Sequence, residues 1–224
     1  MSTSITPVIE DFLSIIYRLE EIYGFARTTD IAKTLKISPG SVVNILKKLS
    51  DMGLINYSKY KGIRLTDDGR KIAEDVIKKH RLVERLLVDI IGVDEIKAHI
   101  VAHKLEHHVE DILEDIARVL ENPDRCPHGN PISPKVSVNE ICLVELEEGS
   151  TGIIVRIANE STDILNMLKS NSIWIGVRIK VIKKSHDSIL VDTGEKSLLI
   201  TNKIARGIFV HGEERCPRSI NSVH

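Results

Sequence analysis

The sequence predicts a mainly α-helical protein with a small β-rich domain after the helices. Up to about residue 122, apolar residues recur at the spacing of amphipathic helices. Four of the seven prolines then fall in one polar stretch, NPDRCPHGNPISP, which we interpret as a linker or an ordered loop. Short runs typical of strands follow, separated by Gly, Asn, Asp and Ser. These runs are CLVEL, TGIIVRI, IWIGVRIKVI, DSILVD and SLLI.

Composition and charge narrow the class of protein. With 42% hydrophobic and 28% charged residues, the chain of 224 residues is typical of a globular protein with one large domain or two small ones. It shows neither a basic leader nor an apolar run of about 20 residues, so we expect a cytoplasmic protein. Three scattered cysteines favour free thiols over a disulfide framework. Because the formal charge is −1, any DNA-binding surface must be locally positive.

The first helical signals lie near the start of the chain. Residues 7–23 form an amphipathic helical pattern that ends at Gly24. The next segment reads TTDIAKTLKISPGSVVNILKKLSDMGLI, and its first part predicts a short helix that ends near Leu35. Thr28 or Thr29 is the candidate N-cap of that helix.

A second short helix and a strand pair complete this part of the chain. After a turn at residues 36–37, Ser38 is the expected N-cap, Pro39 occupies the first helical position, and Gly53 ends the helix. The strand-like segments LINYSKY and GIRLT follow. Two short helices, a tight turn and a strand pair predict a winged helix-turn-helix. An ordinary helical hairpin beside a β-hairpin is the alternative.

Two longer helical patterns come next, at residues 66–91 and 94–121, and we expect the second to break near Val109. Their broad Leu, Ile and Val faces suit a two-fold dimer, which would place two reading heads one DNA turn apart. The same faces are equally compatible with burial inside their own domain.

Histidines and a carboxylate gather on the second of these patterns. His99, His103, Glu106 and His107 stand at i, i+4, i+7 and i+8, which predicts that all four project from one side of one helix. Imidazole and carboxylate groups are ligands for Fe²⁺, Mn²⁺, Ni²⁺, Zn²⁺ and Co²⁺. One helix cannot complete a metal site, and the candidate partners are His80, Glu84 and Asp11. Alternatively, each histidine is a solvated or hydrogen-bonded residue.

Motifs of common enzymes are absent from the sequence. HKLEHH is not the zinc-protease motif HExxH, and neither a GxSxG elbow nor a Walker loop nor a dinucleotide fingerprint is visible. We therefore do not expect an enzyme. A metalloenzyme or metal-storage module with an incidental winged helix is the rival from another class.

The chain resembles the diphtheria toxin repressor family of metal-dependent transcriptional repressors, which includes iron-dependent and manganese transport regulators. The resemblance covers nearly the whole chain and is most specific at HRLVERLLVDIIGVD. It also rests on IEDFLSIIYRLEE, on IAKTLKISPGSVVNILKKLSDMGLI, and on KLEHHVED and CPHGNPI. The resemblance implies a homodimer that represses metal-homeostasis genes by binding operator DNA when a metal is bound.

The resemblance also implies three domains. They are a winged helix-turn-helix at residues 1–73, a helical metal-binding and dimerisation domain with the proline-rich linker at 74–138, and an SH3-like β-barrel at 139–224.

By position, the resemblance implies two metal sites. The primary site is formed by Asp11, His103, Glu106 and His107. The ancillary site is formed by His80, Glu84 and His99, completed by Glu160 and Asp163 from the later segment. Cys126, in the CPHGNPI loop, is expected to be a structural thiol and not a sensor.

At the positions that tune metal choice in the family, this chain differs from both familiar types. Iron-type members carry Met and Cys where Asp11 and His103 stand, whereas manganese-type members carry Asp and Glu, with another Glu where Ser14 stands. A primary site without sulfur suits Mn²⁺ or Fe²⁺. Because a complete ancillary site with an SH3-like domain resembles the iron-type members, we expect Fe²⁺, with Mn²⁺ as the alternative; other divalent transition metals are expected to substitute in vitro.

The second short helix is the expected reading element on DNA. Its first residues are placed to meet base edges, with Asn44 as the best hydrogen-bonding reader. The candidate base-edge residues are Ser38, Pro39, Gly40, Ser41, Val43 and Asn44. The candidate phosphate contacts are Arg27, Lys33, Lys47, Lys48, Lys59, Lys61 and Arg64.

Overall fold

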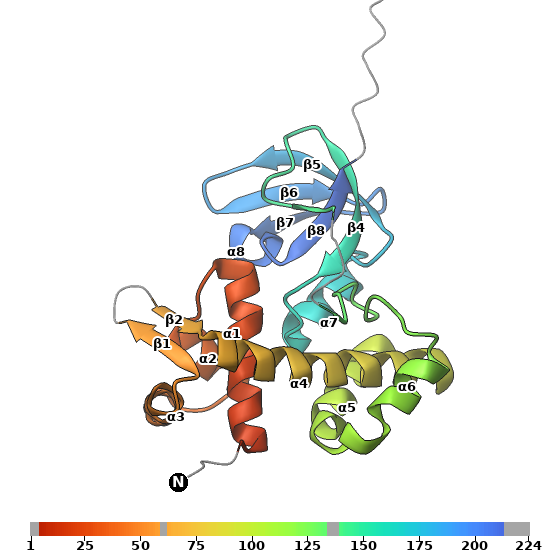
Figure 1. The fold of residues 1–224 in the computed structure, drawn as a ribbon. Coiled ribbons are helices and arrows are strands. Elements are labelled where there is room, and N and C mark those ends of the chain that lie inside the picture. The colour runs from red at the N-terminus through yellow and green to blue at the C-terminus, as the bar shows by residue number, and fades with distance from the viewer. Residues whose placement is uncertain (1–4, 59–61, 134–138, 213–224) are drawn as a thin grey trace, which may run out of the picture. The chain divides into compact units, whose positions relative to one another are not determined.

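The structure is a computed structural model that describes residues 5–58, 62–133 and 139–212. The chain divides into two compact units, coloured by residue number in Figure 1. The first comprises residues 1–137 together with 158–162, and the second comprises residues 138–157 and 163–224. The domain boundaries after residues 73 and 138 remain predictions.

The first unit begins with the expected winged helix-turn-helix. Its elements are α1 (Pro7–Tyr23), α2 (Thr28–Leu35), α3 (Pro39–Asp51), β1 (Ile55–Ser58) and β2 (Gly62–Leu65). The two strands pair antiparallel, with Ile55 opposite Leu65, and form the wing beside α2 and α3 (Figure 1). Lys59 and Lys61, two of the expected phosphate contacts, lie outside the described residues.

Local signals explain the boundaries of these helices. The Ser38 hydroxyl accepts a hydrogen bond from the Ser41 amide, as expected of an N-cap, and Pro39 is the first residue of α3. Gly53, just after α3, has a positive φ of 70°. Helix α2 ends at Leu35 as predicted, but its predicted N-cap was wrong: Thr28 is already helical, and Arg27 occupies the cap position without a side-chain hydrogen bond.

An apolar core holds this part together. A Cβ at Gly69, on the first turn of α4 (Asp67–Arg85), would collide with the carbonyl oxygen of Leu54, so only glycine permits this close approach. The fully buried members of the core include Leu13, Ile16, Ile31, Val42, Leu49 and Ile63.

The rest of the first unit is helical. After α4 come a π-helical turn η1 (Leu86–Ile90), α5 (Glu95–Leu105), the 3-10 turns η2 (Glu106–His108) and η3 (Glu110–Ile112), and α6 (Leu113–Val119). The break expected near Val109 is confirmed, since η2 and η3 flank that residue. The single helix expected for His99 to His107 is wrong, because α5 ends at Leu105 and Glu106 begins η2.

These helices enclose a second apolar core and leave other apolar residues outside. The core includes Leu82, Val83, Ala98 and Ala102. The exposed large apolar residues of this part include Ile90, Ile91, Ile100, Ile112 and Val119.

Among the described residues, no helix has the length and apolar character needed to cross a bilayer.

The second unit is the expected small β domain. Its described strands form an antiparallel sheet in the order β3-β8-β4-β5-β6-β7. The strands are β3 (Ile141–Cys142), β4 (Thr151–Ile157), β5 (Arg178–Lys184), β6 (Ser188–Asp192), β7 (Ser197–Thr201) and β8 (Ile208–Gly212).

Several details of this unit differ from the prediction. Most of CLVEL is turn, and IWIGVRIKVI is extended only from Arg178 onward, since the tight turns before it interrupt the run. The sequence analysis also missed β8 and two short helices, α7 (Thr162–Ser170) and α8 (Asn202–Ala205).

Candidate metal centre and DNA-reading surface

The helical interior of the first unit contains titratable side chains where a core normally holds apolar ones. The buried histidines and glutamates among them are His80, Glu84, His99, Glu106, His128 and Glu160. Potential metal-ligand atoms form three groups, and the atoms within each group lie within 4.8 Å of one another. We name them the outer group (Asp11, Glu106, His107), the middle group (His80, His99, His103) and the inner group (Glu84, Cys126, His128, Glu160).

The outer group joins the winged helix-turn-helix to the helical part. His107 Nε2 lies 3.0 Å from Asp11 Oδ1, and His107 Nδ1 lies 2.6 Å from Glu10 Oε2, so one imidazole meets two carboxylates of α1. His107 Nε2 also lies 3.7 Å from Glu106 Oε1. Because α5 ends at Leu105, Glu106 and His107 lie in the 3-10 turn η2, and their side chains meet in the outer group. Glu106 is buried while His107 reaches α1.

The middle group lies between the carboxylates of the other two. His80, on α4, has Nδ1 2.6 Å from Glu106 Oε2 and Nε2 3.0 Å from His99 Nδ1. The ring of His103 packs 4.4 Å from that of His80, centroid to centroid. His103 Nδ1 is also 3.4 Å from Glu106 Oε1, so His103 touches the outer group through Glu106.

The inner group comes from three separate segments: α4, the CPHGNPI loop and residues 158–162. Glu84 Oε1 lies 2.7 Å from His99 Nδ1 and 3.3 Å from His128 Nδ1. Glu160 Oε1 lies 3.7 Å from His128 Nδ1 and 3.8 Å from Cys126 Sγ. The other oxygen of Glu84, Oε2, is buried without a hydrogen-bond partner among the described residues. A buried carboxylate oxygen left in this way fits a cation-binding role.

Neighbouring charges and hydrogen bonds hold the buried glutamates of these groups in their charged form, whereas burial raises the pKa of Asp11. Although burial opposes ionisation, hydrogen bonds from His103 and His80 hold the pKa of Glu106 well below its usual range. Burial likewise opposes the charge on Glu160, but the Arg18 guanidinium lowers the pKa of this carboxyl to about 2. Charged carboxylates beside imidazoles form a donor set suited to divalent transition metals.

The imidazoles are tuned in opposite directions. Burial lowers the pKa of His99 to about 4, so this ring is neutral at pH 7 and has a lone pair for a metal. Burial also disfavours the charged form of His128, but attraction by Glu84 and hydrogen bonds with Cys126 and Glu84 raise its pKa to about 11. Burial raises the pKa of the Cys126 thiol. A metal ion at the inner group must therefore displace protons.

The structure brings most of the expected metal ligands together but groups them differently. Asp11, Glu106 and His107 lie together, whereas His103 is grouped with His80 and His99. Glu160 lies close to Glu84, as a shared ancillary site requires. Asp163 is in the first turn of α7, in the second unit, and its assignment remains a prediction.

Cys126 and His128 were not predicted to be metal ligands. Their signal was present, because a cysteine and a histidine two residues apart within CPHGNPI are both metal-ligand types. The loop was interpreted as a linker because nothing in its local pattern shows that it meets α4. Asn130, in the same loop, donates from Nδ2 to Glu160 Oε1 at 2.8 Å and helps to position that carboxylate.

The described candidate DNA-contacting residues lie at the surface. Val42, Leu46 and Leu49 bury one face of α3. The opposite face presents Val43, which is 49% exposed, and Asn44. The other described candidates are also exposed: Arg27, Lys33, Ser38, Pro39, Gly40, Ser41, Lys47, Lys48 and Arg64.

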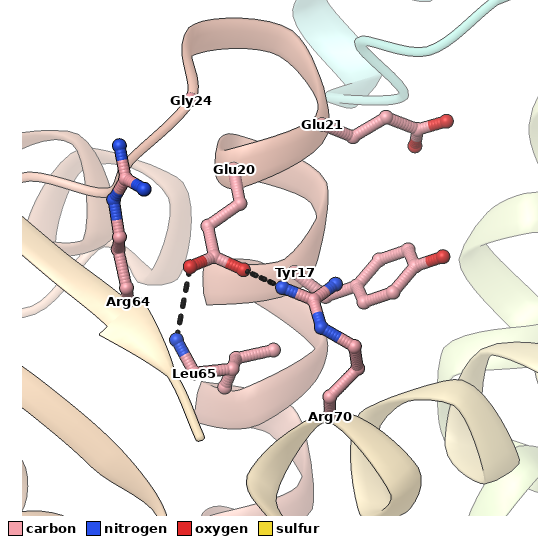
Figure 2. Close-up of a pocket in the computed structure, with 7 residues that line it drawn as sticks. All are labelled: Tyr17, Glu20, Glu21, Gly24, Arg64, Leu65 and Arg70. Carbon is pink, nitrogen blue, oxygen red and sulfur yellow. Dashed lines mark hydrogen bonds and ion pairs between the residues drawn. The ribbon is translucent and has the colours of Figure 1, made fainter. Parts of the chain in front are cut away.

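A polar pocket of about 380 Å³ lies where α1, β2 and α4 meet (Figure 2). Glu20 occupies its centre: Oε1 accepts from the Leu65 amide at 2.9 Å, and Oε2 accepts from Arg70 at 2.6 Å. The Arg70 guanidinium also lies 5.5 Å from the centre of the Tyr17 ring. Because these charges already contact each other, we assign the pocket a structural role that ties α1 to the wing and to α4.

Family models match almost the whole described chain. Residues 4–63 match "Iron dependent repressor, N-terminal DNA binding domain", and residues 66–134 match "Iron dependent repressor, metal binding and dimerisation domain". Residues 141–211 match the FeoA domain. The HTH-type transcriptional regulator MntR of Bacillus subtilis (strain 168) is 43% identical over 94 residues, which are 42% of this chain and 66% of that protein. The match thus spans just under two thirds of that relative.

Solved structures resemble the chain over a greater length. The crystal structure of T. acidophilum IdeR has a TM-score of 0.81 and 31% identity, covering 94% of this chain and all of that one. The metal-dependent transcriptional regulator MtsR has a TM-score of 0.84 and 28% identity, covering 93% of this chain and all of that one. ScaR with bound Zn²⁺ has a TM-score of 0.77 and 30% identity, covering 91% of this chain and 98% of that one.

Proposed function

Since the chain belongs to the family of iron-dependent repressors, we propose that it is a metal-activated, homodimeric transcriptional repressor that binds operator DNA of metal-homeostasis genes. The family consists of DNA-binding regulators, which argues against the rival metalloenzyme interpretation. One observation carries the proposal: His107 of η2 meets Asp11 of α1 at 3.0 Å. The candidate metal ligands therefore join the winged helix-turn-helix from α1 to β2, which we call the reading head, to the helical part from α4 to α6.

The outer group explains how a metal would act as a corepressor. Glu10, Asp11 and Glu106 place carboxylates around one imidazole, and like charges this close repel each other when His107 is neutral and no metal is bound. A divalent cation at this group supplies the positive charge that makes the close approach of α1 and η2 favourable. With α1 held, the head spends more of its time in the orientation that reaches DNA.

We rank Mn²⁺ first and Fe²⁺ second as the activating ion. The outer group offers two carboxylates and one imidazole without sulfur, which suits hard divalent ions. Among similar structures, the manganese regulator SloR is 25% identical over 93% of the chain, while the matching family models bear the name of iron. The preference for Fe²⁺ expected from the sequence is therefore not confirmed. The hydroxyl of Ser14 donates to the Asp11 carbonyl oxygen and adds no carboxylate.

The inner group provides a second candidate site. A thiol, an imidazole and two carboxylates form a softer donor set than the outer group, which suits Zn²⁺, Co²⁺ or Fe²⁺. His80 and His99 lie between the two sites and contact both through Glu106 and Glu84.

On DNA, the exposed face of α3 would enter the major groove. Asn44 is the candidate base reader, and exposed lysines such as Lys47 and Lys48 would contact phosphates. The exposed apolar residues Ile90 and Ile91 suit the contact with a second copy of the chain, which would place two heads on one duplex.

Fluorescence-anisotropy binding to the duplex upstream of the protein's own gene tests this function. Measured anaerobically with chelator and then with Mn²⁺, Fe²⁺ or Zn²⁺, affinity should rise about tenfold or more with the activating ion. Equal affinity in chelator would exclude the metal switch. If no condition gives binding, selection from random duplexes decides whether another sequence is the operator, and failure to select any duplex would refute DNA binding.

A pair of neighbouring histidines provides the matched control. His107→Ala should abolish the metal response because it removes the contact with Asp11. His108→Ala should retain it, because His108 is exposed and belongs to none of the three groups. Loss of the response in both variants would mean that the effect is not specific to the outer group.

A further inference from the structure

Arg18 is a positively charged residue of α1 whose side chain is largely buried. Its side chain is 13% exposed, and its Nη1 lies 3.1 Å from Oε2 of Glu160, whose side chain is 1% exposed. A guanidinium withdrawn from water requires a counter-charge, and Glu160 is the described carboxylate that pairs with it. The ion pair therefore ties α1 to residues 158–162.

The two oxygens of Glu160 face different partners. Oε2 faces Arg18, whereas Oε1 faces the inner group, 3.7 Å from His128 Nδ1 and 3.8 Å from Cys126 Sγ. Asn130 donates to the same Oε1 at 2.8 Å, which fixes the plane of the carboxylate. Glu160 can therefore ligate a cation through Oε1 and keep its ion pair with Arg18 through Oε2.

The position of Arg18 on α1 links this pair to the outer group. Arg18 follows Asp11 by seven residues, or about two helical turns, so both side chains leave the same side of α1. α1 thus contacts the outer group through Asp11 and the inner group through Arg18. A rigid helix held at one of these points is more easily held at the other.

We propose that Arg18 is a positioning residue that transmits occupancy of the inner group to α1, and thereby to the outer group and the reading head. Glu160 would hold such a cation through Oε1, and a carboxylate restrained in this way would keep Arg18 and α1 in the place where Asp11 meets His107. The coupling is reciprocal, so a filled outer group also favours metal binding at the inner group. The inference rests on the proposed function in that it takes both groups to be metal sites.

Cobalt distinguishes the two groups because only the inner one contains sulfur. A Co²⁺ ion bound by Cys126 gives a thiolate-to-cobalt charge-transfer band in the near ultraviolet, whereas the donors of the outer group give none. The background variant His107→Ala weakens the outer group, so that restraint of α1 reports the inner group alone. Hydrogen exchange of peptides from α1, measured by mass spectrometry, then reports that restraint in the full chain without DNA.

The comparison uses three further changes on that background. Arg18→Gln removes the charge, and Arg18→Met removes it while keeping an apolar stem, so a folding failure of one leaves the other for the test. Arg70→Gln is the matched control, because it removes another ion pair of α1, that with Glu20, which lies outside the three groups (Figure 2).

Addition of Co²⁺ to the background protein should slow exchange in α1 about fivefold or more. The uncharged Arg18 variants should keep the charge-transfer band but lose the Co²⁺-induced slowing of exchange in α1. Arg70→Gln should keep both the band and the slowing. The proposal is overturned if Co²⁺ still slows exchange in α1 without Arg18, if this slowing is lost equally in Arg70→Gln, or if the background protein gives no charge-transfer band. Because the assay contains no DNA, failure of the full protein to bind a duplex would refute the proposed function without changing this result.

Discussion

The reading head and the helical interior both contain an apolar core, but they differ in where their candidate functional residues lie. In the head, the core is built from apolar side chains such as Leu13 and Leu49, and the candidate DNA contacts such as Asn44 are exposed. In the interior, the candidate functional residues Glu84 and Glu106 are themselves buried. The head is thus held by residues that its function does not use, whereas folding and function of the interior depend on the same side chains.

This difference has an energetic reason. Burying an apolar side chain stabilises the fold without a partner, whereas burying a carboxylate costs free energy that its hydrogen bonds or a cation must offset. The interior therefore gains more from a bound metal than the head does. Substitutions in the head should therefore change the free energy of unfolding equally with and without metal. Substitutions in the interior should change it by different amounts in the two conditions.

Leu49→Ala gives the largest expected effect in the head. Leu49 is fully buried in the core of the head, and removing such a side chain costs about 2–5 kcal/mol of unfolding free energy. Denaturant unfolding in chelator and in excess Mn²⁺ measures this loss. The comparison of head and interior predicts a similar loss of unfolding free energy in both conditions. A loss confined to the metal-free protein would contradict it.

The pH dependence of metal affinity should be steep at the inner group. His128, with a pKa raised to about 11, and Cys126, whose pKa burial raises, both carry protons at neutral pH, while Glu160, with a pKa of about 2, is already charged. Binding should therefore release about two protons, and each contributes about 1.4 kcal/mol of affinity per pH unit gained. Titration with Co²⁺ between pH 6.5 and about 8.5 measures the slope; a flat profile contradicts the assignment.

Asn44→Ala should affect DNA recognition alone. A bidentate contact between asparagine and adenine contributes about 1–3 kcal/mol of discrimination, and Asn44 is exposed on α3 and belongs to none of the metal groups. Binding to duplexes changed at single positions should show relaxed specificity at one base pair. The ratio of affinities with and without metal should stay as in the unmodified protein, and its loss would show that head and interior are not separable.

Lys47→Ala should have the smallest effect. Lys47 is exposed on α3 and is assigned to phosphate, so its removal should weaken binding to all duplexes alike. The slope of log affinity against log salt concentration should fall in magnitude by about one. A sequence-dependent change in affinity would instead assign this lysine to a base edge.

The sequence predicted the head well because its signals are local. The signals at Ser38, Pro39 and Gly53 act on the backbone only within a few residues of themselves. The structure confirms the helix that they delimit, α3. The misplaced cap at Thr28 shows the limit of such signals, since this threonine is itself the first helical residue.

The interior was less predictable because its geometry depends on distant contacts. Helical spacing correctly placed His80 and Glu84 on α4. Neither Gly nor Pro marks the end of α5 at Leu105, so the change from α5 to the 3-10 turn that carries Glu106 and His107 could not be seen from spacing. The inner group joins α4 to residues far along the chain, and no local pattern reports such a meeting.

The reciprocal effect of DNA on metal binding tests the central claim most directly. If metal ligands join α1 to η2 and thereby orient the reading head, operator DNA must tighten metal binding by the factor by which metal tightens DNA binding. Mn²⁺ isotherms measured with and without the operator duplex should therefore differ about tenfold or more, matching the anisotropy result. Identical isotherms would contradict the account, since the metal would then bind without sensing the head.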